Sequence, residues 1–279
     1  MKFDFFTYGG AIFWEDVFFY QKWRIQRNCF TKKYRLLDSW DIRRACGTFD
    51  MCKNAFIEYI ESHEITKQKG KMVVLLHGYM DSKNIFKKLW RKFILTKTTV
   101  VALNYPSLFR NAKASAHQLL FFLNHTDDMT EVSFVTKGCG NLVLQNMFNL
   151  PIETQIFLEK TRIRNVVLIN PVLRENLFCE FLVKFRIFRW ICGPMLYDMS
   201  KTSIESTPSI PSGIKCLKIF SESKTYRFFI SLIKLCKFPL KNDNISGKDS
   251  IIVKRTNFSA LDNDELLNYV VKFINNGKI

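Results

Sequence analysis

Residues 131–148 read EVSFVTKGCGNLVLQNMF, and the rest of the chain is organised around this stretch. Its first part, residues 132–136, is a short apolar run of β-branched and aromatic side chains, which is typical of a buried strand. In residues 141–148 the apolar side chains recur at helical spacing. The tripeptide Gly-Cys-Gly at positions 138–140 separates the two parts. The stretch therefore predicts a strand that turns sharply into a helix through small residues.

A tight strand-to-helix turn is the geometry of a nucleophile elbow, in which small residues flank the nucleophile so that the two arms can approach. The pattern is small-x-nucleophile-x-small, and its five positions here are Thr136, Lys137, Gly138, Cys139 and Gly140. The nucleophile position falls on Gly138, which has no side chain. The sequence thus retains the scaffold of the elbow without its serine.

The composition indicates a folded domain with a strong positive charge. At 279 residues, with 47% hydrophobic and 15% aromatic content, the chain can bury a large α/β core with room for a small subdomain. The formal net charge of +17 would attract an anionic partner, either nucleic acid or an acidic lipid surface. However, the basic residues are scattered, and no zinc-finger, RNP or glycine-rich phosphate motif occurs. The pattern therefore argues against nucleic acid as the partner.

Cysteine usage and hydropathy predict a cytoplasmic protein. The eight Cys form no C-x-x-C pair and have no metal-binding spacing with the four His, so we expect free thiols, no metal and no cofactor. Acidic residues interrupt the aromatic N-terminus, and no signal peptide is predicted. The longest apolar stretches are shorter than the roughly 18–20 residues that cross a bilayer, so no transmembrane span is expected.

Residues 1–65 are expected to form an N-terminal extension. The aromatic residues within 1–20 suggest a short helix that docks on the main body. Two alternating runs, residues 23–28 and 34–38, predict a β-hairpin. A change of period then predicts a helix that starts near Phe49.

Residues 66–279 are expected to form the main domain, because buried strands alternate with amphipathic helices along it. The predicted strands are residues 72–76, 99–104, 132–136, 165–170, 214–220 and 251–253. The predicted helices are residues 82–93, 112–125, 141–148 and 265–274. This alternation predicts a parallel sheet with right-handed crossovers. Residues 173–212 carry no strand signal and predict a basic amphipathic helix or helix pair, inserted over the sheet as a cap or lid.

The order of elements resembles the α/β-hydrolase fold, in particular the bacterial lipase- and esterase-like serine hydrolases. The similar stretches are VVLLHGYMDS (73–82), VVALNYPS (100–107), FVTKGCGN (134–141), NVVLINP (165–171) and ELLNYVVKFINNG (265–277). The resemblance covers about residues 70–279. It implies a three-layer αβα sandwich with a mainly parallel sheet, to which this chain would add the helical cap and the small N-terminal hairpin and helix.

The resemblance also implies an oxyanion hole made of backbone N–H groups. In the family, the residue after the HG dipeptide and the residue after the nucleophile supply these donors. The corresponding residues here are Tyr79 and Cys139, and backbone donors survive any change of side chain. His77 and Gly78 correspond to loop-structuring positions, and we expect His77 to be a hydrogen-bonded histidine behind the site rather than a ligand or base.

The positions of the catalytic triad are degenerate under the same resemblance. The nucleophile position is Gly138, and the base position, where relatives carry a Ser-His-Thr-like stretch, is Asn257 in RTNFSA. Glu222 and Asp243 are weak candidates for the acid. Glycine cannot attack a carbonyl, asparagine cannot accept a proton at neutral pH, and no His follows His125.

Three functions are compatible with the sequence. The preferred one is a degenerate hydrolase-like protein, a pseudoenzyme that binds an apolar small molecule, a lipid or another protein. The first alternative is an active hydrolase of an ester, thioester or lipid that uses Cys139 or another group. A helix N-terminus could lower the pKa of Cys139. The second is a module that lies peripherally on a membrane surface through the basic aromatic segments 177–196 and 226–240.

Overall fold

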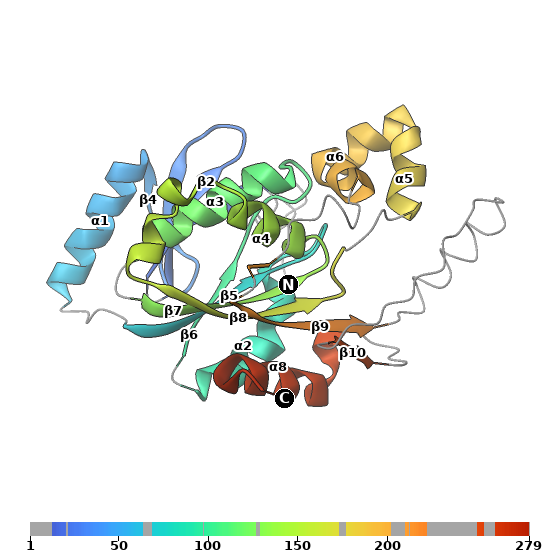
Figure 1. Cartoon of the computed structure of the whole chain (residues 1–279). Coiled ribbons are helices and arrows are strands. Elements are labelled where there is room, and N and C mark those ends of the chain that lie inside the picture. Colours follow the sequence, from blue (N-terminus) through green and yellow to red (C-terminus); the bar gives the residue numbers. More distant parts are fainter. Residues whose placement is uncertain are drawn as a thin grey trace.

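Figure 1 shows the chain as a computed structural model. The structure describes residues 13–20, 22–63, 69–96, 98–126, 129–172, 177–201, 210–211, 213–221, 250–253 and 260–278.

A six-stranded parallel sheet forms the centre of the molecule. Its strands are β5 (Gly70–Leu76), β6 (Thr99–Leu103), β7 (Met129–Lys137), β8 (Arg162–Ile169), β9 (Lys215–Ser221) and β10 (Ser250–Val253). They lie in the order β10-β9-β8-β7-β5-β6, and every neighbouring pair is parallel. The parallel sheet predicted from the alternation of strands and helices is confirmed, and β7 lies inside it between β5 and β8.

Helices cover both faces of this sheet, so the predicted three-layer αβα architecture is confirmed (Figure 1). One face carries α3 (Ala112–Asn124) and α4 (Gly140–Phe148), and the other carries α2 (Lys87–Ile94) and α8 (Asp264–Asn276). Alternate residues of β5 point into the hydrophobic cores on opposite faces of the sheet. Val74 and Leu76 pack towards α3 and α4, whereas Val73 and Leu75 pack towards α2 and α8. Within the described residues, 3₁₀ segments lie at Lys83–Phe86, Ile152–Thr154, Ile156–Glu159 and Ala260–Asp262.

The N-terminal region is a larger sheet than the sequence predicted. An antiparallel meander contains β1 (Trp14–Tyr20), β2 (Trp23–Asn28), β3 (Tyr34–Leu37) and β4 (Arg43–Gly47), and α1 (Phe49–Ser62) follows it. The predicted hairpin is its β2–β3 centre, and the helix predicted from Phe49 is confirmed. The helix expected within residues 1–20 is wrong over the part that the structure describes, because residues 14–20 form β1. Residues 1–12 lie outside the described part of the chain.

Buried polar residues attach this N-terminal sheet to the edge of the parallel sheet. The Asp16 N–H donates to the Asn104 carbonyl at 2.9 Å, and the Asn104 N–H donates to Asp16 Oδ2 at 2.8 Å, directly beyond β6. Gln118 of α3 donates from Nε2 to the Asp16 carbonyl at 2.7 Å. The strand that carries Asp16 is therefore bonded to both the sheet and one of its covering helices.

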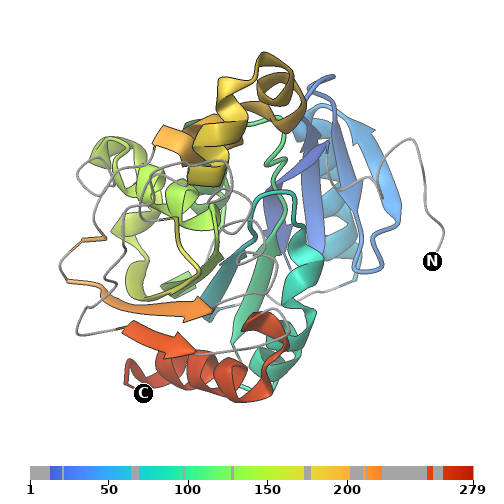
Figure 2. The same ribbon diagram turned by 90° about the vertical axis from the view of Figure 1, so that its right-hand side faces the viewer.

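Two helices after β8, α5 (Leu177–Lys184) and α6 (Arg186–Lys201), pack together beyond the carboxyl ends of the strands (Figures 1 and 2). They are called the cap helices below. They supply the helix pair expected within residues 173–212, of which residues 173–176, 202–209 and 212 lie outside the described part. Helix α6 is broken at Gly193, whose φ is +69°, and Pro194 follows. None of the described helices combines the length and the apolar character needed to span a bilayer.

Candidate functional site

The turn between β7 and α4 has the shape that the sequence predicted. Strand β7 ends at Lys137 and α4 begins at Gly140. A Cβ added at Gly140 would lie 2.7 Å from the Leu76 carbonyl oxygen and 3.0 Å from that of His77. Because both atoms belong to the backbone, the close approach of α4 to the end of β5 requires glycine here. This turn is called the elbow below.

Gly138 occupies the apex of the elbow. Its φ is +52°, in the left-handed region that glycine adopts most readily. A Cβ added to it would meet Gly78 Cα at 3.7 Å, an ordinary van der Waals distance. The direction in which a side chain would leave the apex therefore points at the loop after β5, and at Gly138 itself only backbone faces that loop.

His77 lies in the core behind this loop. Its Nδ1 lies 2.8 Å from the Gly78 carbonyl oxygen and Nε2 accepts a 3.4 Å hydrogen bond from the Tyr105 N–H, which assigns the proton to Nδ1. The ring stacks on Tyr105 with a centroid separation of 4.2 Å. Burial lowers the pKa of His77, so the imidazole is neutral and both nitrogens are engaged. These contacts fit the loop-structuring role expected of His77 and leave no free nitrogen to accept a proton from a nucleophile.

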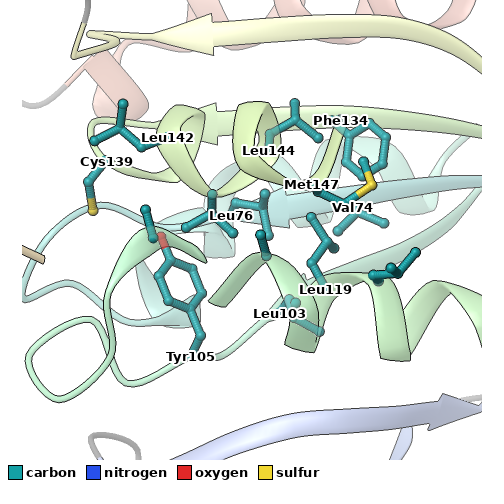
Figure 3. Close-up of a cluster of buried hydrophobic side chains, with 14 of the residues drawn as sticks. Val74, Leu76, Leu103, Tyr105, Leu119, Phe134, Cys139, Leu142, Leu144 and Met147 are labelled. Carbon is teal, nitrogen blue, oxygen red and sulfur yellow. The ribbon is translucent and has the colours of Figure 1, made fainter. Parts of the chain in front are cut away.

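Cys139, the alternative nucleophile, is fully buried (Figure 3). Burial raises the pKa of its thiol to about 12. The nearby Tyr105 hydroxyl donates its single proton to the His77 carbonyl, so it does not donate to the sulfur. A thiol with such a pKa stays protonated at neutral pH, whereas nucleophilic cysteines are thiolates in accessible, electropositive surroundings. The helix N-terminus that could have activated Cys139 does not offset its burial.

The cap helices are fixed directly to the loops around the elbow. The hydroxyl of the half-buried Tyr79 donates to the Cys192 carbonyl of α6, and burial raises the pKa of this hydroxyl. A Cβ added at Gly193 would lie only 1.7 Å from the Leu108 carbonyl oxygen, so the break in α6 rests against the loop after β6. The side chain of Tyr79, whose backbone N–H is the predicted oxyanion donor, thus helps to hold the cap.

The structure also shows polar contacts at the elbow that the sequence analysis missed. Lys137 Nζ and Asp81 Oδ2 form an ion pair at 2.9 Å, and the Asn141 amide exchanges two 3.0 Å hydrogen bonds with the Val172 backbone. The signal that could have found them is the position of these residues just after parallel strands, because the carboxyl ends of such strands meet at one edge of a sheet.

The remaining predicted site residues are not brought to the elbow by the described structure. Asn257, Glu222 and Asp243 lie outside the described residues. His63 stacks on Tyr59 at the end of α1. Of the other two histidines, His117 lies on α3 and is exposed, and His125 caps the C-terminus of α3 and stacks on Phe121.

Two small cavities lie at the opposite end of the sheet. One has a volume of about 30 Å³ beside Met72, Thr99 and Met129, where β5, β6 and β7 begin. The other has a volume of about 10 Å³ beside Lys71 and Glu131. Each has room for about one water molecule. Within the described ranges, no three His, Cys, Asp or Glu side chains gather as metal ligands would.

No protein-family model and no curated protein sequence matches this chain. Solved structures resemble it in part. An α/β hydrolase, GrgF from Penicillium sp. sh18, shares 12% identity at a TM-score of 0.48, over 74% of this chain and 90% of its own. The esterase EaEST from Exiguobacterium antarcticum shares 11% identity at a TM-score of 0.45, over 74% of this chain and 92% of its own. Lipase B from Aspergillus fumigatus shares 17% identity at a TM-score of 0.39; the match spans 55% of this chain but only 37% of the lipase.

Proposed function

We propose that this protein is an α/β-hydrolase-like scaffold without serine-hydrolase chemistry, and that it acts by binding. The observation that carries the proposal is the bare apex of the elbow. Gly138 has the left-handed φ of the turn, and the direction of its missing side chain faces Gly78. In the family that the sequence resembles, an attacking oxygen occupies this position.

The absence of a suitable base supports the same proposal. Acyl transfer by a side chain requires a nucleophile and a base within hydrogen-bond reach. By the resemblance, the base position falls on Asn257, which cannot accept a proton. The imidazole of His77 is near the elbow, but it is neutral and held by Gly78 and Tyr105. Nucleophile and base act as one unit, so losing them removes nearly all of the rate enhancement except that from binding and the oxyanion donors.

Binding at the surface of the protein is favoured over an apolar small molecule or a lipid inside the elbow. Tyr79 and Gly193 hold the cap helices against the loops there. The two cavities described above are water-sized and lie at the far end of the sheet. A site for a small apolar ligand usually has a volume of roughly 300 Å³ or more.

Activity-based labelling tests the proposal. The purified protein is incubated with a fluorophosphonate probe and with short-chain p-nitrophenyl esters, beside an active serine esterase as a positive control. We expect neither labelling nor turnover. The Gly138→Ser variant should also remain unlabelled, because a serine without a base is not activated. Robust labelling or turnover by the wild-type protein would overturn the proposal, and labelling of the variant alone would show that a working base is present.

The alternative of an active thiol hydrolase is tested at Cys139. If Cys139 were the nucleophile, Cys139→Ala would abolish any ester or thioester hydrolysis. We expect Cys139→Ala to leave any residual hydrolysis unchanged. We also expect iodoacetamide to modify the exposed Cys46 of the native protein much faster than the buried Cys139. Peptide mapping by mass spectrometry distinguishes the two sites, and rapid modification of Cys139 would favour the alternative.

A further inference from the structure

The first half of α6, together with the turn before it, exposes large apolar side chains. Phe185, Ile187, Trp190 and Ile191 are all exposed, and Trp190 exposes 85% of its surface. These four residues are called the cap face below. Single exposed apolar residues are common in proteins, but four within seven positions form a patch of the kind that marks an interaction site.

The second half of α6, which follows the cap face, attaches this helix to the core. The second half of α6 is held in the core by Met195, Leu196 and Met199, and Cys192 accepts the hydrogen bond from Tyr79. The cap face precedes the break at Gly193. In Figures 1 and 2 the cap helices lie at the periphery of the molecule, beyond the sheet. The segment is thus attached through its second half while the cap face stays accessible.

The chain around the cap face carries an excess of positive charge. Between Glu180 and Asp198, residues 181–197 contain three basic residues and no acidic residue. Lys184 and Arg186 border the cap face and are exposed. The next acidic residue along the chain, Asp198, accepts a 2.6 Å hydrogen bond from the Ala112 N–H at the start of α3. This local excess has the same sign as the net charge of +17 for the whole chain.

We propose that the cap face binds the surface of a bilayer that contains anionic lipids. Aromatic and aliphatic side chains would enter the boundary between headgroups and acyl chains, and the exposed Arg186 would contact the anionic headgroups. Tryptophan is enriched at this boundary, which suits Trp190. A second copy of the chain fits less well, because it would bring equal positive charges together and because protein interfaces are depleted in lysine.

Co-sedimentation with lipid vesicles tests this binding and does not depend on the chemistry of the elbow. The full-length protein is mixed with vesicles of phosphatidylcholine alone or of phosphatidylcholine with phosphatidylserine, at low and high salt. We expect binding to the mixed vesicles, which high salt weakens. Arg186→Gln should weaken it by roughly fivefold, whereas Arg43→Gln, at an exposed arginine of β4, should leave it unchanged.

A matched pair of tryptophans tests the apolar part of the proposal. Trp190→Ala should weaken vesicle binding by roughly tenfold, whereas Trp40→Ala, at a tryptophan that is 82% exposed, should have no effect. Brominated lipids should quench tryptophan emission in the wild-type protein and in Trp40→Phe, but much less in Trp190→Phe.

Several results would overturn the proposal. These are an absence of binding to mixed vesicles at low salt, equal binding to both kinds of vesicle at both salt concentrations, or identical binding by Trp190→Ala and the wild-type protein. Sedimentation equilibrium adds another: a dimer that Trp190→Ala dissociates would assign the cap face to a second copy of the chain. None of these results bears on the fluorophosphonate experiment, so the two proposals fail separately.

Discussion

The elbow and the cap face lie in the same part of the molecule but are built in opposite ways. At the elbow, backbone packs against backbone, and a Cβ at Gly140 would overlap the end of β5. At the cap face, large side chains such as that of Trp190 are exposed. The shape of the elbow comes from close packing of backbone, whereas the cap face consists of large side chains exposed to solvent. Substitutions in the first region should therefore change stability, and those in the second should change only binding.

The largest effect is expected where the cap helices meet the body. Gly193→Val would place a Cβ 1.7 Å from the Leu108 carbonyl oxygen, at a φ of +69° that valine avoids. Overlap with backbone cannot be relieved by a rotamer change, so the cap must move. We expect a loss of at least about 3 kcal/mol in the free energy of unfolding, measured by urea denaturation. The control is Gly213→Ala, where an added Cβ meets nothing within 4 Å; equal stability of the two variants would contradict this packing.

The two glycines of the elbow should differ from each other. Gly140→Ala forces a Cβ against two carbonyl oxygens of the neighbouring strand end and should cost about 2 kcal/mol of unfolding free energy. Gly138→Ala has room for its Cβ, so only the left-handed φ is penalised, and the cost should be about 1 kcal/mol. Urea denaturation of both variants under one set of conditions gives the comparison. If Gly138→Ala were the more damaging change, the apex would be more crowded than the structure indicates.

Local sequence signals predicted the parallel sheet, because runs such as residues 72–76 are apolar at every position and buried on both faces of a sheet. The same reasoning failed for β1. Glu15 and Asp16 interrupt its apolar pattern, yet both are buried, and they bind Arg27 and Gln26 of β2. Partners that come from another strand are invisible to a local pattern, so β1 was predicted as a helix.

The candidate site likewise contains one feature that the local sequence predicted and others that it did not. The Gly-x-Gly spacing at Gly138 and Gly140 is local, and the sequence located the turn correctly. The ion pair between Lys137 and Asp81 joins residues 56 positions apart, and the hydrogen bond from Tyr79 to Cys192 joins residues 113 positions apart. Such contacts depend on the strand order and on how the cap docks, which no single stretch of sequence specifies.

A smaller loss of stability is expected at acidic pH, because His77 lies buried behind the elbow. Burial lowers the pKa of His77, so the unfolded chain binds its proton more readily than the folded chain does. The contribution of His77 to stability is therefore complete above the unfolded pKa near 6.5 and is lost as the pH falls below it. The free energy of unfolding, measured from pH 8 to pH 5, should fall less steeply in His77→Gln than in the wild-type protein. The exposed His63→Gln is the matched control, and equal slopes in all three proteins would exclude His77 as the source.

Substitutions at the cap face should have the smallest effect on stability, in contrast to substitutions at the elbow. Trp190 exposes 85% of its surface, so truncating it removes few intramolecular contacts. We expect Trp190→Ala to change the free energy of unfolding by no more than about 0.5 kcal/mol, as for other surface substitutions. Urea denaturation without lipid provides the measurement. Trp23→Ala is the comparison variant, because the Trp23 side chain of β2 is buried against α1 and truncating it should lower the free energy of unfolding by about 3 kcal/mol. A large loss of unfolding free energy in Trp190→Ala would mean that the Trp190 ring packs inside the molecule in solution. The cap face would then belong to the core and would not be an exposed binding surface.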